Sequence, residues 1–210
     1  MKKLINISLS EIKLNDLTKL KNETLILGSY ESKKLSAVTE IFDKKSKGVL
    51  KKLISREELS GSLGNKVYLP NLEGINSEKV YFIGCGKENK EINEQEFLAF
   101  SQSIANAAIQ SKAKNVHIFI PNILVKNRSE EWNYKILART LESNCYKYFF
   151  KGKKNQPKNT LSKVIILKTA EGKKLPALSK ALKVGHITAV GMNTSSCLLY
   201  TSDAADDTCC

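Results

Sequence analysis

The chain lacks the long apolar run of a membrane-spanning helix. No stretch approaches the ~20 consecutive apolar residues that a spanning helix needs. Near the amino terminus Asn6, Ser8 and Glu11 interrupt the apolar residues, so a signal peptide is not predicted. With 41% hydrophobic and 26% charged residues, the composition is typical of a globular protein. We expect a soluble, cytoplasmic protein with no membrane partner.

Arginine is scarce although the chain is basic. The formal net charge is +13, but Arg56, Arg128 and Arg139 are the only arginines. Proteins that read phosphates and base edges rely on the planar fork of arginine. The lysines are spread over every segment, as codon bias in an AT-rich genome would produce, and this interpretation is favoured. A lysine-rich module that binds DNA or RNA is the alternative.

Paired cysteines are also lacking. Of the five cysteines, three lie within residues 197–210, which leaves Cys85 and Cys145. Neither belongs to a CxxC motif or lies near a histidine cluster. We expect two isolated, buried thiols in a reducing compartment, with no disulfide and no zinc site.

The last residues are unlike the rest of the chain. Residues 197–207 resemble one translated frame of an adapter used to build sequencing libraries. We therefore expect 197–210 to be an artefactual tail, with the natural sequence departing near Ser196. Leaving out its three aspartates raises the net charge from +13 to +16.

Apolar periodicity predicts an α/β fold with a mixed, largely parallel sheet flanked by helices. Short apolar runs closed by glycine or proline indicate strands, and apolar residues at helical spacing indicate helices. Strands are predicted at 4–9, 23–30, 66–69, 80–83, 116–120 and 164–167. Helices are predicted from Ser36, after Gly48, and over 94–111, 129–150 and 178–194. We expect an α/β domain over 1–172 and a linker helix over 173–196.

The segment from 80 to 120 is the strongest architectural signal. Two strands that are apolar throughout flank a helix, which predicts a βαβ unit with parallel strands and a right-handed crossover. Asn93 is a suitable N-cap, and Glu96 three residues later completes a capping box.

Gly84-Cys85-Gly86, between a strand and a helix, partly matches a phosphate-binding loop. The first two glycines of GxGxxG are present, but the third position is Asn89 and no GK[ST] follows. A tight turn is the favoured interpretation. The alternative is a small-ligand or nucleotide site, because open α/β sheets bind ligands at strand ends.

No other residue has a pattern that indicates catalysis. His117 in a strand and His186 in the last helix lack metal-binding spacing, so a satisfied or surface histidine is expected at each. Trp132 and Tyr134 are expected to pack in the core. The acids near the predicted helix start at 94 fit the helix dipole; they are Glu88, Glu91, Glu94 and Glu96. We predict no catalytic, cofactor-binding or metal-binding residue.

Six segments, in order and spacing, resemble the N-terminal domain of the leucyl (cytosol) aminopeptidase family. They are 34–36, 59–64, 78–88, 124–128 ahead of Trp132, 148–151 and 184–194. The resemblance runs from about Glu23 to Thr194 and implies a macro-domain-like fold. The family would continue with a further motif where Ser195-Ser196 runs into the tail, so we expect a chain truncated before its catalytic domain.

The resemblance implies a non-catalytic assembly or regulatory domain. In that family a separate catalytic domain holds two divalent metals (zinc, manganese or magnesium) and removes N-terminal residues from peptides. Homo-oligomers, commonly hexamers, are implied, with the missing catalytic domain as the main partner. Some bacterial members bind DNA. None of the family's ligand positions can be placed on this sequence, and residues 201–206 mimic a ligand motif only superficially. This chain alone is expected to be inactive.

Overall fold

The computed structural model describes residues 4–31, 36–145, 160–169 and 174–206, with side chains to Ser195. Its centre is a six-stranded sheet in the order β1-β6-β5-β2-β4-β3. All neighbouring strands are parallel except β3 and β4, which are antiparallel. This confirms the predicted mixed, largely parallel sheet. The strands are β1 (Asn6–Glu11), β2 (Thr24–Ser29), β3 (Lys66–Pro70), β4 (Lys79–Gly84), β5 (Asn115–Phe119) and β6 (Lys163–Lys168).

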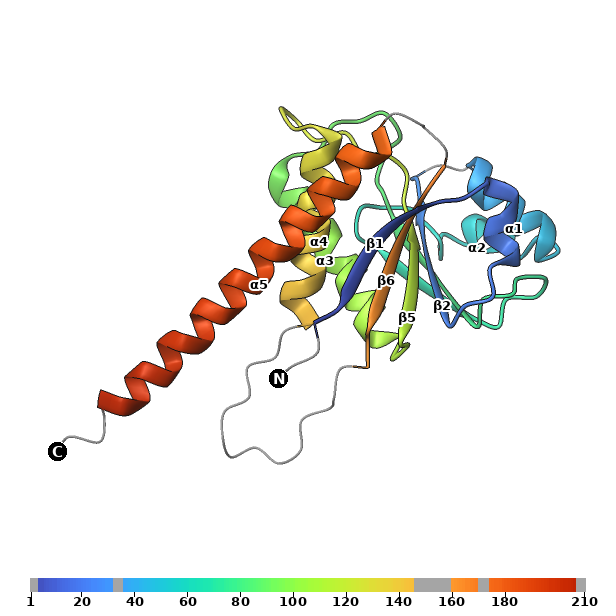
Figure 1. Ribbon diagram of the computed structural model, residues 1–210. Helices are drawn as coiled ribbons and strands as arrows, with labels where there is room; N and C mark the ends of the chain where they lie inside the picture. Colours follow the sequence, from blue (N-terminus) through green and yellow to red (C-terminus); the bar gives the residue numbers. More distant parts are fainter. Residues whose placement is uncertain (1–3, 32–35, 146–159, 170–173, 207–210) are drawn as a thin grey trace.

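Helices cover both faces of the sheet, and α3, α4 and α5 lie on the opposite side from α1 and α2 (Figure 1). The helices are η1 (Leu14–Lys19), α1 (Ala37–Lys45), α2 (Val49–Ser55), α3 (Glu94–Gln110), α4 (Glu130–Cys145) and α5 (Leu175–Asp206). Each predicted helix is present. The 3-10 helix η1 was not predicted, because Leu14 and Leu17 alone give too short an apolar pattern.

Alternating strand residues divide the core in two. Ile26 and Ile118 point toward α3 and α4 and are fully buried. Leu25 and Phe82 belong to the other cluster, which Phe42 of α1 joins. Each large side chain buried in this way stabilises the fold by about 1.5–3 kcal/mol. Period-two alternation in strands buried on both faces is therefore what holds the sheet between its two helical layers.

The predicted capping box at the start of α3 is present. The Asn93 side chain accepts a hydrogen bond from the Glu96 N–H at 2.9 Å, and the Glu96 carboxylate accepts one from the Asn93 N–H at 2.7 Å. Strands β4 and β5 on either side of α3 are both parallel to β2, which lies between them. The predicted parallel βαβ unit is thus confirmed. In the sheet, β2 lies between its two strands.

Two helices differ from their predicted bounds. Helix α4 ends at Cys145, and the predicted continuation to 150, which includes Tyr148, lies outside the described residues. Helix α5 runs past the predicted end at Thr194 to Asp206. No proline or glycine follows Gly191 in this stretch, so nothing local interrupts the helix. The domain boundary at 172 and the artefactual tail stay predictions.

Helix α5 packs closely on α4. A Cβ on Gly185 would come within 2.0 Å of the Lys135 carbonyl oxygen, so only glycine fits at this crossing. At the next residue of α5, His186 Nε2 lies 3.1 Å from Oε2 of the buried Glu142. On its outer side α5 exposes Val184, Ile187 and Met192. These three side chains form an exposed apolar row along α5.

Candidate functional site

At the end of β4, the carboxyl edge of the sheet is closed by backbone hydrogen bonds. Ligands bind at this edge in many open α/β folds. At the Gly84-to-Gly86 turn each N–H has a protein acceptor. The Gly84 N–H donates to the Asn65 carbonyl, the Cys85 N–H to the Ser29 carbonyl, and the Gly86 N–H to the Gly61 carbonyl, at 2.8–3.0 Å. These donors are therefore not available to a phosphate. The tight-turn interpretation is the one that the geometry supports.

Close packing closes the same edge sterically. A Cβ on Gly84 would lie 1.9 Å from the Ser62 carbonyl oxygen, and one on Gly61 would lie 2.2 Å from the Tyr30 carbonyl oxygen. Gly61 also has φ +70°, a conformation that favours glycine. A Cβ on Gly28 would meet the Pro121 ring at 2.4 Å. The glycines here let neighbouring backbones touch, and they leave no phosphate-sized space between them.

Two ionisable groups at this edge, Cys85 and Tyr30, are neutral at physiological pH. Burial raises the pKa of the Cys85 thiol to about 12, far above its ordinary value of 9.0. Burial, with the nearby Cys85 and Glu88, raises the pKa of the Tyr30 hydroxyl to about 12. Cys85 and Cys145 are both buried, as predicted. Because a thiol reacts as its thiolate, Cys85 is not a candidate nucleophile.

The opposite, amino edge of the sheet is open. A groove of about 560 Å³ lies where β2, β4, β5 and β6 begin. Its volume is within the range of small-molecule sites. We call it the amino-edge groove, and it is lined by Lys21, Asn22, Glu23, Asn76, Glu78, Asn115, His117, Lys163 and Ile165.

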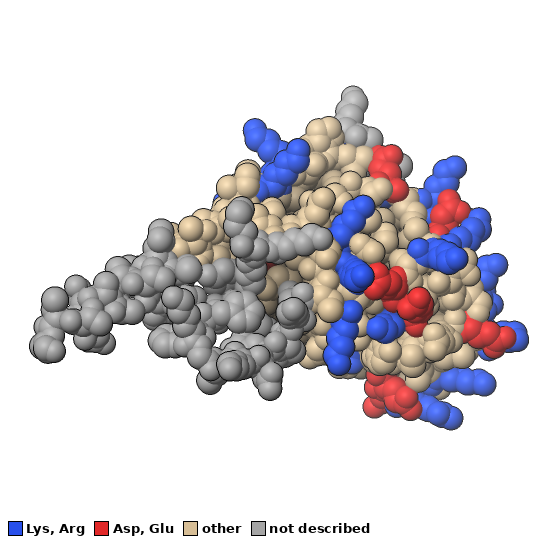
Figure 2. Space-filling model, turned by 60° about the horizontal axis from the view of Figure 1, so that its bottom comes forward, with Lys and Arg blue, Asp and Glu red and all other residues tan. Residues whose placement is uncertain are grey.

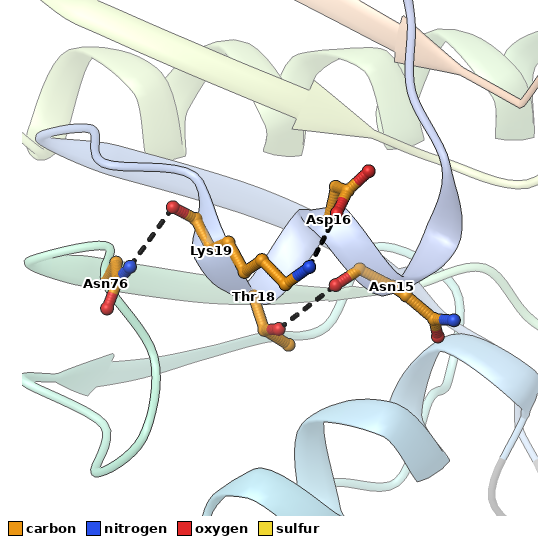
Figure 3. Close-up of polar contacts among 5 residues, drawn as sticks. All are labelled: Asn15, Asp16, Thr18, Lys19 and Asn76. Atoms are coloured by element: carbon orange, nitrogen blue, oxygen red, sulfur yellow. Dashed lines mark hydrogen bonds and ion pairs between the residues drawn. The ribbon is translucent and has the colours of Figure 1, made fainter.

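Hydrogen bonds join η1 to the β3–β4 loop and so fix one wall of the groove. Asn76 Nδ2 donates a hydrogen bond to the Lys19 carbonyl at 3.1 Å (Figure 3). Within η1, the Thr18 hydroxyl donates to the Asn15 carbonyl, and Lys19 forms an ion pair with Asp16. The Glu78 N–H donates to the Asn22 carbonyl at 3.2 Å. The wall is therefore held by hydrogen bonds between two separate segments.

Two residues of the groove lining carry polar atoms that lie beneath its surface and have no partner among the described residues. Both amide atoms of Asn22 and Nδ1 of His117 are buried without a hydrogen bond. His117 lies in register between Leu25 of β2 and Ile165 of β6. Burial, and then the charge of Lys163, lowers the pKa of His117. His117 is therefore neutral at pH 7, with one nitrogen as donor and the other as acceptor.

The other residues that the sequence singled out have structural roles. His186 pairs with Glu142, as described above. Glu94, in the first turn of α3, accepts hydrogen bonds from Arg128, whose guanidinium lies 5.3 Å from the centre of the Trp132 ring. Trp132 in turn packs on Phe97 at 5.6 Å between ring centres. Glu88, Glu91 and Glu96 lie on the surface near this helix start. These residues do not converge on one site.

Within the described ranges, no three His, Cys, Asp or Glu side chains come together as a possible metal site. The residues present therefore do not fit a divalent metal, and we derive no catalytic step from one. In the same part of the chain, none of the helices has the length and apolar character to span a bilayer.

Charges of both signs are mixed on the face shown in Figure 2, at the end of the molecule where β6 begins. A nucleic-acid-binding face would show basic side chains gathered without acids between them. The alternative of a lysine-rich DNA- or RNA-binding module stays a prediction, and this face does not support it.

Solved structures define the class of fold. The chain matches the macrodomain of Mycobacterium tuberculosis DarG (TM-score 0.54, 10% identity, 77% of this chain and 97% of that one). It also matches a Trypanosoma brucei macrodomain in complex with ADP (TM-score 0.52, 10% identity, 84% of this chain and 69% of that one). The fold is therefore that of a macrodomain. At 10% sequence identity the likeness concerns the fold and nothing further. A tomato leucine aminopeptidase mutant aligns better (TM-score 0.68, 18% identity, 90% of this chain and 37% of that one).

Sequence comparison defines the family. The model of the cytosol aminopeptidase family N-terminal domain matches residues 26–154. A probable cytosol aminopeptidase of Pasteurella multocida is 36% identical over 70% of this chain and 30% of its own length. A probable cytosol aminopeptidase of Actinobacillus pleuropneumoniae serotype 3 is 28% identical over 89% of this chain and 38% of its own length. The chain belongs to the cytosol aminopeptidase family and carries its N-terminal domain. It spans about a third of the length of these relatives.

Sequence reasoning missed the amino-edge groove, whose residues come from four separate segments. A signal was present, because Glu23, Glu78 and Asn115 each stand just before or at the start of a parallel strand. Parallel strands begin at one edge of the sheet, so polar residues in that position are brought together.

Proposed function

We propose that the chain serves as the non-catalytic assembly or regulatory domain of an aminopeptidase. The longer protein would remove N-terminal residues from peptides by two-metal hydrolysis, in the cytoplasm. The observation that carries the proposal is coverage: the chain aligns with 38% or less of relatives that are named aminopeptidases. The part of those relatives that it does not match is long enough for a separate catalytic domain.

The side chains that could bind a metal agree with a non-catalytic role for this chain. The described residues offer no ligand cluster for the two ions, so we propose that the ligands belong to the unmatched region. We also propose that this region, or a neighbouring subunit of a homo-oligomer, covers the apolar side of α5. Exposed apolar residues at this spacing on one helix are typical of a surface that another domain buries.

An activity assay tests the first part. The purified 210-residue chain, supplied with Mn²⁺ or Zn²⁺, should hydrolyse leucine anilide no faster than buffer, while the full-length Pasteurella relative serves as the active control. Turnover by the chain that disappears on chelation and returns with metal would contradict the proposal.

A docking assay tests the second part. The chain would be co-expressed with the remaining region of the Actinobacillus relative, and we expect the two to elute together in gel filtration. Ile187→Glu should weaken this association, because it puts a charge in the exposed apolar row of α5. Lys52→Glu, on the distant helix α2, is the control and should not. Equal elution of both variants with the partner would argue against docking through α5.

A further inference from the structure

We propose that the amino-edge groove binds a small zwitterion of the α-amino-acid class with an apolar side chain. The groove is formed by residues of this chain alone, so the site does not depend on the proposed function. It also lies at the opposite edge of the sheet from the closed Gly84-to-Gly86 turn.

The charges of the groove are balanced in a way that suits a ligand carrying both signs. Lys21 and Lys163 bring two ammonium groups, and Glu23 and Glu78 bring two carboxylates. Lys21, Lys163 and Glu78 have no ion pair or side-chain hydrogen bond among the described residues. A simple anion would meet two carboxylates here, and a simple cation two ammonium groups. A zwitterion can satisfy both.

Glu23 is held in place to receive an ammonium group. Its Oε2 accepts a hydrogen bond from the Lys114 N–H at 2.9 Å, and its Oε1 accepts one from Asn115 Nδ2 at 3.1 Å. An ionised carboxylate has about four lone-pair sites, so acceptor capacity remains on both oxygens. Fixing the group beforehand removes part of the entropy cost of binding.

His117 forms the neutral polar part of the lining, and Asn22 lies beside it. Both amide atoms of Asn22 and Nδ1 of His117 are buried beneath the groove surface, so they do not face a ligand. His117 is neutral, so one of its ring nitrogens donates a hydrogen bond and the other accepts one. Beside them the half-buried Ile165 is the apolar part of the lining, which fits an aliphatic side chain.

The probe is L-leucine, and the measurement is saturation-transfer NMR on the full 210-residue chain. We expect a Kd on the order of 1 mM, which is reasonable for a ligand of few atoms in an open groove. Two analogues each lack one charge: 4-methylpentanoate has no amine, and 3-methylbutylamine has no carboxylate. Each should bind about tenfold more weakly, since one charged hydrogen-bonding end is lost.

Paired variants locate the site. Lys163→Gln and Glu78→Gln should each weaken leucine binding about tenfold. Lys52→Gln and Glu58→Gln make the same charge changes on the exposed end of the α2 region and should leave binding unchanged. Thermal melts of all four variants check that the fold is retained.

Three results would overturn the proposal. The first is no saturation transfer to leucine at ten times the expected Kd. The second is 4-methylpentanoate binding as tightly as leucine, which would make the groove a plain anion site. The third is an equal loss of affinity in the groove variants and their α2 controls, which would mean that net charge and not the groove attracts the ligand.

Discussion

The two edges of the sheet are built from different residues and have opposite characters. At the carboxyl edge, glycines let backbones approach to contact distance, and the turn's N–H groups all donate to protein carbonyls. At the amino edge, lysine, glutamate and asparagine side chains surround a groove, and the polar atoms buried beneath it have no partner among the described residues. The fold places the two edges, and the residues at each edge decide whether it is closed or open.

The largest expected loss of stability comes from a substitution at the closed edge. Gly84→Ala places a Cβ 1.9 Å from the Ser62 carbonyl oxygen and 2.7 Å from Gly61 backbone atoms, so the 61–64 loop must move. We expect the free energy of unfolding to fall by about 3 kcal/mol or more, measured by urea denaturation.

The matched control for that variant is Gly191→Ala in α5, where nothing lies within 4 Å of the added Cβ. It should raise stability by about 0.5–1 kcal/mol, because alanine is the better helix former. Equal effects of the two substitutions would show that steric closure at Gly84 is not what the geometry indicates.

The second prediction concerns alkaline pH. The pKa of Cys85 is about 12 in the folded chain and near 9.0 when unfolded. The unfolded state therefore loses its proton first, and the stabilising contribution, complete below pH 9, is lost as pH rises toward 12. The expected slope is about 1.4 kcal/mol per pH unit. Urea titrations between pH 8 and 11 should show a shallower slope for Cys85→Ala, and identical slopes would refute the assignment.

The third prediction moves to the open edge. Glu23→Ala removes the acceptor for the Lys114 N–H and the Asn115 amide. Since the site is partly exposed and water can replace the carboxylate, we expect a loss of only about 1 kcal/mol. Glu58→Ala, exposed and without a side-chain partner among the described residues, should change stability by less than about 0.5 kcal/mol. A large loss at Glu23 would mean that the open edge is as tightly built as the closed one.

The smallest expected effect on stability concerns His117, at the open edge. Burial and Lys163 lower its pKa, so the unfolded state binds the proton more readily, and this part of the stability is lost as pH falls below about 6.5. Lys163→Gln should raise the pKa of His117 in an NMR titration, with little change in stability near pH 7. Lys52→Gln should leave that pKa where it is, and a shift there would point to a general charge effect.

Local chemistry explains which parts of the fold could be predicted. The start of α3 was predictable because Asn93 and Glu96 satisfy each other within one turn, and the strands because their apolar runs end at Gly28, Gly84 or Pro121. The insertion of β2 between β4 and β5 was not, since pairing partners leave no local mark. The end of α5 was predicted at Thr194 because residues 197–206 were predicted to be a tail, whereas the helix continues to Asp206 through a stretch without glycine or proline after Gly191.

The candidate site shows the same limit. The turn at Gly84 to Gly86 was predictable as a turn, because glycine spacing is local. The amino-edge groove required knowing that Asn22, Glu78 and Lys163 end up at one edge, and that depends on strand order. That Glu23 is fixed by Asn115 could not be seen before the two segments were paired.

The pairing of the first strand with the last has a consequence for how the protein is made. Asn6 of β1 pairs with Lys163 of β6, so β1 has no partner until nearly the whole domain has left the ribosome. At ordinary rates of translation the delay is on the order of 10–30 s. During that time an unpaired strand edge is open to the wrong partners. A chaperone that holds the nascent amino terminus should therefore raise the yield of folded protein more than one that acts after release.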